Sequence, residues 1–178
     1  MTMCKRNATF SLLVAMTAMV LWNLSATAAT VDLPDGSKLD TSADCPVCHM
    51  KVDSNPVGSA AVVFKDGKVV GFDGTADLFK YFLDPKKHGF DPANIKSVFV
   101  TDYGSKKFVD AKTSFFVVGS EVKGLMGPDP LAFGKKEDAE KFKADHKGQK
   151  VLAFGEVTIK DVESAKKKKL KMDHGHGG

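Results

Sequence analysis

The sequence predicts an α+β fold made of two similar ββαβ units packed together, with a cysteine-containing loop ahead of the first unit. Two observations support this prediction. Short apolar runs of strand length alternate with longer amphipathic segments. An apolar strand end followed by a helix start also occurs at Phe72 and again 61 residues later, at Phe133, which indicates a weak internal duplication. Because a unit of about 60 residues buries too little of its surface alone, the two units are expected to pack closely.

The first unit is predicted from turn and cap residues between its apolar runs. Asp66-Gly67 separates two strand-like runs and favours a tight type I′ hairpin turn. Gly74-Thr75 supplies a helix N-cap, and apolar residues then recur at helical spacing until Pro85. The predicted strands are residues 60–64, 69–72 and 95–103.

The second unit repeats this pattern less clearly. Gly148 is placed to end its helix. The predicted helix covers residues 137–146, and the predicted strands are 108–111, 115–118, 131–133, 151–154 and 157–159. The chain is therefore divided into a secretion signal peptide (1–28), a lead-in with the cysteine loop (29–59), the first unit (60–104), the second unit (105–160) and a flexible tail (161–178). Within the lead-in, the polar residues 30–43 are expected to be mobile.

The N-terminus has the three parts of a secretion signal. Lys5 and Arg6 precede an apolar run over about residues 10–24, and Ala26-Thr27-Ala28 forms a small-residue cleavage site. The run is short for a membrane span, which needs about 20 residues. We therefore expect cleavage near Ala28 and a periplasmic protein. Cys4 precedes the apolar run, so it cannot become the acylated first residue of a lipoprotein.

Charge and cysteine content exclude several classes of protein. Of 178 residues, 26 are Lys or Arg and 22 are Asp or Glu, and loss of Lys5 and Arg6 leaves a net charge of only about +2. This weak balance argues against nucleic acid as a partner. Only Cys45 and Cys48 remain after the signal, so the fold cannot depend on a disulfide framework.

The segment Asp44-Cys45-Pro46-Val47-Cys48-His49-Met50 is the most informative motif. Its two thiols and one thioether are soft donors, which suit Cu(I) better than hard ions such as magnesium or calcium. His49 adds a possible nitrogen donor. The sequence therefore predicts a copper-binding loop that precedes the first unit, with a fourth donor to come from elsewhere in the fold.

Met126 is the candidate for that further donor. It lies among glycines and prolines in Gly124-Leu125-Met126-Gly127-Pro128, away from any amphipathic stripe, so core packing explains it poorly. Neighbouring glycines allow the backbone to approach another loop closely. The alternative is that Met126 only fills a gap in a surface turn.

These motifs, taken in order, resemble the NosL family. The resemblance covers residues 44–159 and rests on Cys45-Pro46-Val47-Cys48-His49-Met50, Phe64-Lys65-Asp66-Gly67, Phe72-Asp73-Gly74, Leu78-Phe79-Lys80-Tyr81 and Gly124-Leu125-Met126-Gly127. It implies two ββαβ units and delivery of Cu(I) during assembly of nitrous oxide reductase, with Cys45, Cys48, Met50 and Met126 as ligands. His49 replaces the family's usual glycine, and Leu125 replaces its usual proline. Many members are lipoproteins, so membrane tethering of this chain is in doubt.

Two other functions stay open on the sequence. A periplasmic thiol-disulfide oxidoreductase could use Cys45 and Cys48, although the pair does not follow a strand and begin a helix as in thioredoxin-like proteins. A zinc-stabilised module would need a second pair of ligands at fixed spacing, which the sequence does not show. We therefore expect a copper carrier and not an enzyme.

The C-terminal tail combines a lysine run at 166–169 with two histidines, His174 and His176. Such a tail is typical of a solvated arm, and its imidazoles could serve as auxiliary metal donors. An acidic partner surface or anionic headgroups could attract its lysines.

Overall fold

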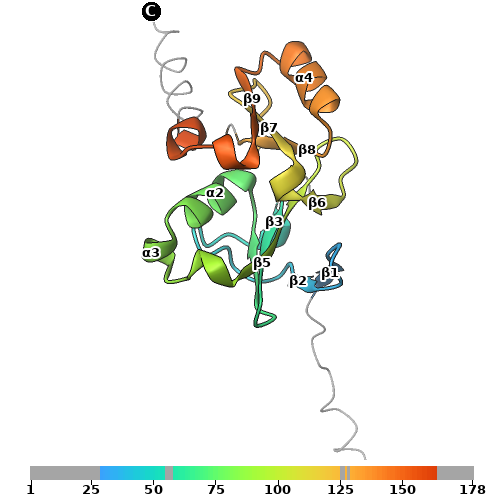
Figure 1. The fold of residues 1–178 in the computed structure, drawn as a ribbon. Helices are drawn as coiled ribbons and strands as arrows, with labels where there is room; N and C mark the ends of the chain where they lie inside the picture. Colours follow the sequence, from blue (N-terminus) through green and yellow to red (C-terminus); the bar gives the residue numbers. More distant parts are fainter. Residues whose placement is uncertain (1–28, 55–57, 125–126, 128, 164–178) are drawn as a thin grey trace, which may run out of the picture.

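The computed structural model describes residues 29–54, 58–124, 127 and 129–163 (Figure 1). The predicted α+β class is confirmed. In these residues the strands form a two-stranded sheet β1-β2, a four-stranded sheet β4-β3-β5-β6 and a three-stranded sheet β8-β7-β9. The predicted tail, with His174 and His176, lies almost entirely outside the described residues, as do the signal segment and Met126.

The first unit has the predicted order, with β3 as the central strand. It consists of β3 (Ala60–Phe64), β4 (Val69–Phe72), α2 (Thr75–Leu83) and β5 (Ile95–Thr101). The predicted type I′ turn is wrong, because that turn needs two residues with positive φ and only Gly67 has one, at 88°. Phe64 N instead donates to Lys68 O at 2.8 Å, which closes a three-residue loop with Gly67 in the left-handed region.

The second unit has the same topology. It consists of β7 (Phe115–Val118), β8 (Leu131–Phe133), α4 (Lys136–Asp145) and β9 (Lys150–Ala153), and β7 lies between β8 and β9. β6 (Phe108–Asp110), expected in this unit, pairs with β5 in the first sheet. The hairpin of the second unit is therefore β7-β8, joined by the long connection that contains Met126.

The predicted strand over 157–159 is wrong. The chain leaves β9 through a 3₁₀ turn, η4 (Phe154–Glu156), and residues 159–163 are helical. Thr158 and Asp161 explain the change, because Thr158 N donates to Asp161 Oδ2 at 3.1 Å and Asp161 N donates back to Thr158 Oγ1 at 3.4 Å. This reciprocal capping starts a helix at Ile159.

The lead-in, expected to be mobile, contains a hairpin of β1 (Thr30–Asp32) and β2 (Lys38–Asp40). Leu33 and Leu39 are buried against Val52 and Val63, so two apolar residues fix a segment that is otherwise polar. The short helices are η1 (Val52–Ser54), α3 (Pro85–His88), η2 (Pro92–Asn94) and η3 (Ala111–Thr113).

The two units share one core, which α2 joins. Phe79 of α2 lies with its ring centroid 4.9 Å from that of Phe116 in β7 and 5.3 Å from that of Phe154. Figure 1 shows α2 between the strands of the first unit and the second unit. Helix α2 is therefore packed on both sides, which restricts its position and that of the junction with β4.

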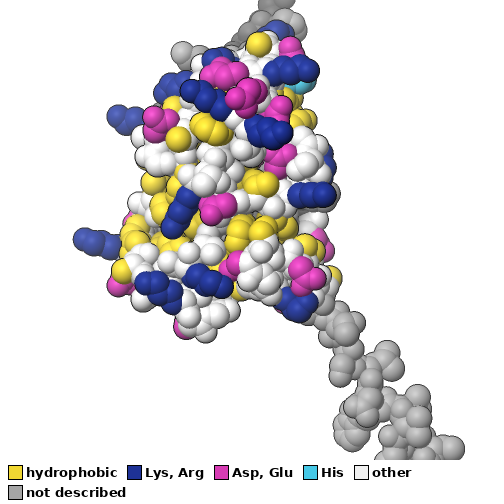
Figure 2. Space-filling model, turned by 45° about the vertical axis from the view of Figure 1, so that its right-hand side comes forward, with side chains coloured by type: hydrophobic (Ala, Val, Ile, Leu, Met, Phe, Trp, Pro, Cys, Tyr) yellow, Lys and Arg dark blue, Asp and Glu magenta, His cyan; other side chains and the backbone are white. Residues whose placement is uncertain are grey.

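The surface carries no broad field of one charge on the face drawn in Figure 2. Lysine and acidic side chains alternate there, with hydrophobic side chains gathered between them near mid-height. This mixture agrees with the weak net charge of the sequence.

Candidate metal centre

The cysteine loop is a closed turn that precedes η1. Cys45 N donates to Met50 O at 2.8 Å, and His49 N donates to Cys45 O at 2.9 Å. Outside the turn, Lys51 Nζ pairs with an Asp44 carboxylate oxygen at 2.8 Å. His49 has φ of 62°, in the left-handed region that favours glycine. A glycine would adopt this conformation without strain. This chain has a histidine there instead.

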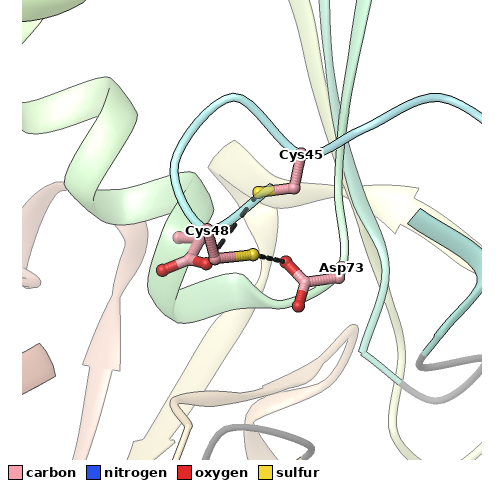
Figure 3. Close-up of side chains that lie close together, drawn as sticks. Cys45, Cys48 and Asp73 are labelled. Carbon is pink, nitrogen blue, oxygen red and sulfur yellow. Dashed lines mark hydrogen bonds between the residues drawn. The ribbon is translucent and has the colours of Figure 1, made fainter. Parts of the chain in front are cut away.

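The loop directs both thiols towards the start of α2. Cys48 Sγ donates to Asp73 Oδ1 at 3.0 Å, and Cys45 Sγ lies 3.9 Å from Asp77 Oδ2. Figure 3 shows the side chains of Cys45, Cys48 and Asp73 converging on one space. One potential ligand atom from each of the four residues lies within 4.8 Å of the others, and among the described His, Cys, Asp and Glu residues this is the group that could hold a metal ion.

The two carboxylates come from the junction between β4 and α2. Asp73 follows the strand directly, and Asp77 lies in the first turn of the helix. Both face the cysteine loop, since Asp73 accepts from Cys48 and Asp77 from Cys45. Both side chains are buried although they are acidic, which is uncommon for aspartate unless it has a partner.

Burial controls the protonation of the thiols. It raises the pKa of Cys45, and it raises the pKa of Cys48 still further because the thiol also donates its proton to Asp73. In the metal-free protein both cysteines are therefore protonated at neutral pH. A metal ion that binds as a thiolate complex must displace these protons.

The remaining predicted ligands have different positions. Met50 closes the cysteine loop through its carbonyl, and its side chain is half-buried. His49 is exposed and does not belong to the cluster of Cys45, Cys48, Asp73 and Asp77.

The base of the connection that contains Met126 lies beside the centre. Thr75 Oγ1 donates to Pro130 O, and an Asp129 carboxylate oxygen would lie 3.2 Å from a Cβ added at Gly74. Gly124 also contacts Asp129 so closely that a side chain there would have no room. The described residues on both sides of Met126 are thus fixed next to Asp73 and the start of α2.

Sequence reasoning missed Asp73 and Asp77. The available signal was the pair of aspartates four residues apart at a predicted strand-to-helix junction. That stretch predicted a helix start and formed part of the motifs shared with the family, without a metal-binding role for either aspartate.

The fold and the centre define a class: a small α+β protein in which a thiol and carboxylate cluster, assembled at a helix N-terminus, can hold a metal ion. The family model for NosL matches residues 36–162. The chain therefore belongs to the NosL family, and the resemblance found in the sequence is confirmed.

Two relatives support this assignment. The copper-binding lipoprotein NosL of Stutzerimonas stutzeri is 29% identical over 142 residues, which cover 75% of this chain and 70% of the relative. The crystal structure of the copper chaperone NosL from Shewanella denitrificans is 32% identical, with a TM-score of 0.58 over 67% of this chain and 92% of that one. Neither relative is named as an enzyme. Among the described residues, no helix has the length and apolar character to cross a membrane.

Proposed function

We propose that this chain is an exported Cu(I)-binding accessory protein, a metallochaperone that delivers copper during maturation of nitrous oxide reductase or another exported cuproenzyme. The observation that carries the proposal is the convergence of two free thiols, Cys45 and Cys48, in a protein whose relatives are named for copper. Thiolates and thioethers are the donors that stabilise the cuprous state.

The proposed ligands are Cys45, Cys48, Met50 and Met126. The first three come from one closed loop. Met126 is supported by the fixed positions of Gly124 and Asp129, which frame it in sequence and lie beside Gly74. In the metal-free protein Asp73 and Asp77 accept from the thiols and orient the sulfur atoms. They are not proposed as copper ligands, because Cu(I) prefers soft donors.

Release of copper would begin at the weakest bonds. A thioether is neutral and binds more weakly than a thiolate, so a recipient ligand can replace Met50 or Met126 first. Cys48 and Met50 are only half-buried and His49 is exposed, so this side of the loop is the accessible one. The exposed His49 is placed to contact a recipient protein or to bind copper transiently through a ring nitrogen.

The redox alternative is disfavoured by the thiols themselves. Catalytic cysteines in thiol-disulfide exchange have a lowered pKa, because the thiolate is the nucleophile. Burial here raises the pKa of both Cys45 and Cys48. No helix begins at Cys45 or Cys48 to stabilise a thiolate.

A zinc site is a second candidate, and one observation favours it. Asp73 and Asp77 complete a set of two cysteines and two carboxylates, which is the number of ligands that structural zinc needs. The missing second ligand pair, on which the sequence argument against zinc rested, is thus supplied by aspartates.

Export and the client are the finer parts of the proposal. Export is supported by the signal-like N-terminus and by the lipoprotein relative. Nitrous oxide reductase is the client that the family resemblance implies. His174 and His176 are proposed only as auxiliary metal donors near the C-terminus.

A competition experiment tests the proposal. The mature protein, kept anaerobic and reduced, is offered equal Cu(I) and Zn(II) against chelators of known affinity for each. We expect one cuprous ion per chain with copper preferred over zinc. The double variant Cys45→Ser/Cys48→Ser should lose copper, and Met126→Leu, a change of similar volume, should weaken binding by about tenfold. Preference for zinc, or full copper binding by the double variant, would overturn the proposal.

Delivery needs a separate measurement. Copper-loaded protein is mixed with metal-free nitrous oxide reductase and, in parallel, with an unrelated metal-free cuproenzyme. Transfer to the reductase alone would identify the client, whereas equal transfer to both would contradict a dedicated role.

A further inference from the structure

Lys80 is the cation that contacts the centre. It lies one turn beyond Asp77 on α2, and its Nζ donates to Asp77 Oδ1. The side chain of Asp77 is 5% exposed and that of Lys80 is 26% exposed, so this ion pair is largely shielded from water. The other oxygen of Asp77 faces Cys45 Sγ. Both oxygens of this carboxylate therefore have protein partners.

The ion pair between Lys80 and Asp77 differs from an ordinary surface ion pair on a helix. Lys143 of α4 makes the same i,i+3 contact with Glu140 at 2.8 Å, but there the partner carboxylate is 45% exposed and belongs to no ligand cluster. An ion pair of that kind contributes little to stability. Lys80 differs because its partner carboxylate belongs to the cluster of potential ligands: Lys80 holds Oδ1 of Asp77, and the other oxygen, Oδ2, faces Cys45 Sγ.

The chemistry of the donors makes the Asp77 carboxylate important for selectivity. Zinc binds carboxylate oxygen readily and needs four ligands, whereas Cu(I) is held by sulfur and does not need the carboxylates. The cluster of Cys45, Cys48, Asp73 and Asp77 has the composition of a divalent site, and Lys80 reduces the negative charge that would attract such an ion.

We propose that Lys80 determines the metal selectivity of this centre: its ammonium group neutralises Asp77 by holding Oδ1, which disfavours a divalent ion at the four-residue cluster and leaves the sulfur donors for Cu(I). The inference rests on the proposed function, since it presumes that copper is the cargo. The positive charge adds a repulsion that acts twice as strongly on a divalent ion as on a monovalent one.

The test compares three variants of the mature protein under anaerobic, reducing conditions. Lys80→Met keeps the long apolar stem but removes the charge and the donor. Lys80→Arg keeps both. Lys143→Met is the matched control, because it removes an equivalent ion pair from α4, away from the cluster. Dissociation constants for Zn(II) and for Cu(I) are measured separately with competing chelators, and thermal unfolding checks that each variant is folded.

For Lys80→Met we expect Zn(II) to bind about tenfold more tightly, while Cu(I) affinity stays within about twofold. Lys80→Arg and Lys143→Met should match the unsubstituted protein for both ions. The inference is overturned if Zn(II) affinity of Lys80→Met is unchanged, if both ions gain equally, or if Lys143→Met gives the same gain. The proposed function fails by a different result, namely that the unsubstituted protein does not bind Cu(I), and the inference would then fail with it.

Discussion

The junction between β4 and α2 and the junction between β8 and α4 have the same place in the two units but different contents. In the first unit Asp73 and Asp77 meet two thiols from the cysteine loop. The positions 61 residues later are Gly134 and Asp138. Gly134 N donates to Asp102 Oδ2 at 2.7 Å.

The residues that pack against each junction explain the difference. At the second junction the neighbours of Gly134 are Val109 and Asp102, since Val109 Cγ1 would lie 3.7 Å and Asp102 Oδ2 3.8 Å from a Cβ added there, and neither brings a thiol. The carboxylate of Asp102 ties the end of β5 to the end of β8 and thus links the two sheets. One backbone arrangement therefore carries the candidate metal centre in one unit and a structural tie in the other. The chemistry depends on the segment that covers the junction and not on the fold of the unit.

The largest expected effect is on stability, and it distinguishes Asp102 at the second junction from Asp73 at the first. Burial opposes the charge of Asp102, but donation from the backbone N–H groups of Ser105 and Gly134 outweighs it and lowers the pKa. Asp102→Ala removes two charge-assisted hydrogen bonds and should reduce the free energy of unfolding by about 3 kcal/mol, measured by urea denaturation, without changing copper affinity. Because its pKa is lowered, the stability from Asp102 is present above the ordinary value of 3.8 and is lost as pH falls through the folded value.

Asp73→Ala is the counterpart and should behave in the opposite way. It leaves the free energy of unfolding within about 1 kcal/mol but weakens Cu(I) binding by about tenfold, because Cys48 loses the group that orients it. If Asp102→Ala weakened copper binding as much as Asp73→Ala, the division of roles between the junctions would be wrong.

A smaller effect on stability is expected at two equivalent positions, one in β4 and one in β8. Gly71 of β4 corresponds to Ala132 of β8, 61 residues later. A Cβ at Gly71 would lie 2.7 Å from both Leu39 Cδ1 and Val52 Cγ2, because β2 and η1 pack against this part of β4. Gly71→Ala should therefore cost about 2 kcal/mol by overpacking.

Ala132→Gly is the matched change in the second unit, and it should cost about 1 kcal/mol through backbone entropy. Thermal unfolding of both variants measures the difference. A neutral Gly71→Ala would show that the covering hairpin can move aside.

The smallest effect concerns pH and the metal-free protein. Since folding raises the pKa of Cys48, this thiol contributes stability that is fully present below its ordinary value of 9.0 and is lost progressively as the pH rises from there towards the folded value. Cys48→Ser keeps a donor to Asp73 and does not titrate. Between pH 7 and pH 10 the unsubstituted protein should lose about 1 kcal/mol relative to this variant, by urea unfolding with reductant and chelator present. A difference that does not change with pH would contradict the raised pKa.

The sequence predicted those parts of the molecule that local chemistry determines. The hairpin β3-β4 and helix α2 follow from apolar spacing, turn residues and Pro85, and they were placed correctly. The loop with Cys45 and Cys48 was recognised because soft donors at short spacing are uncommon. The pairing of β6 with β5 in the first sheet was not predicted, because strand pairing is decided by distant residues and not by the strand's own sequence.

The centre could be predicted only in part for a similar reason. Asp73 and Asp77 become candidate ligands only when a loop 25 to 32 residues earlier in the chain packs against α2. Likewise, the apolar residues of 157–159 resembled a strand, whereas the contact between Thr158 and Asp161 sets a helix there. Burial and capping partners of this kind are not visible in periodicity.

The closed turn from Cys45 to Met50 has a consequence for engineering the centre. Two backbone hydrogen bonds hold the turn, the ion pair between Asp44 and Lys51 joins its flanks, and none of these contacts uses a sulfur atom. The scaffold of the loop and its donor atoms are therefore separate, so the side chains of Cys45, Cys48 and Met50 can be exchanged while the turn keeps its shape.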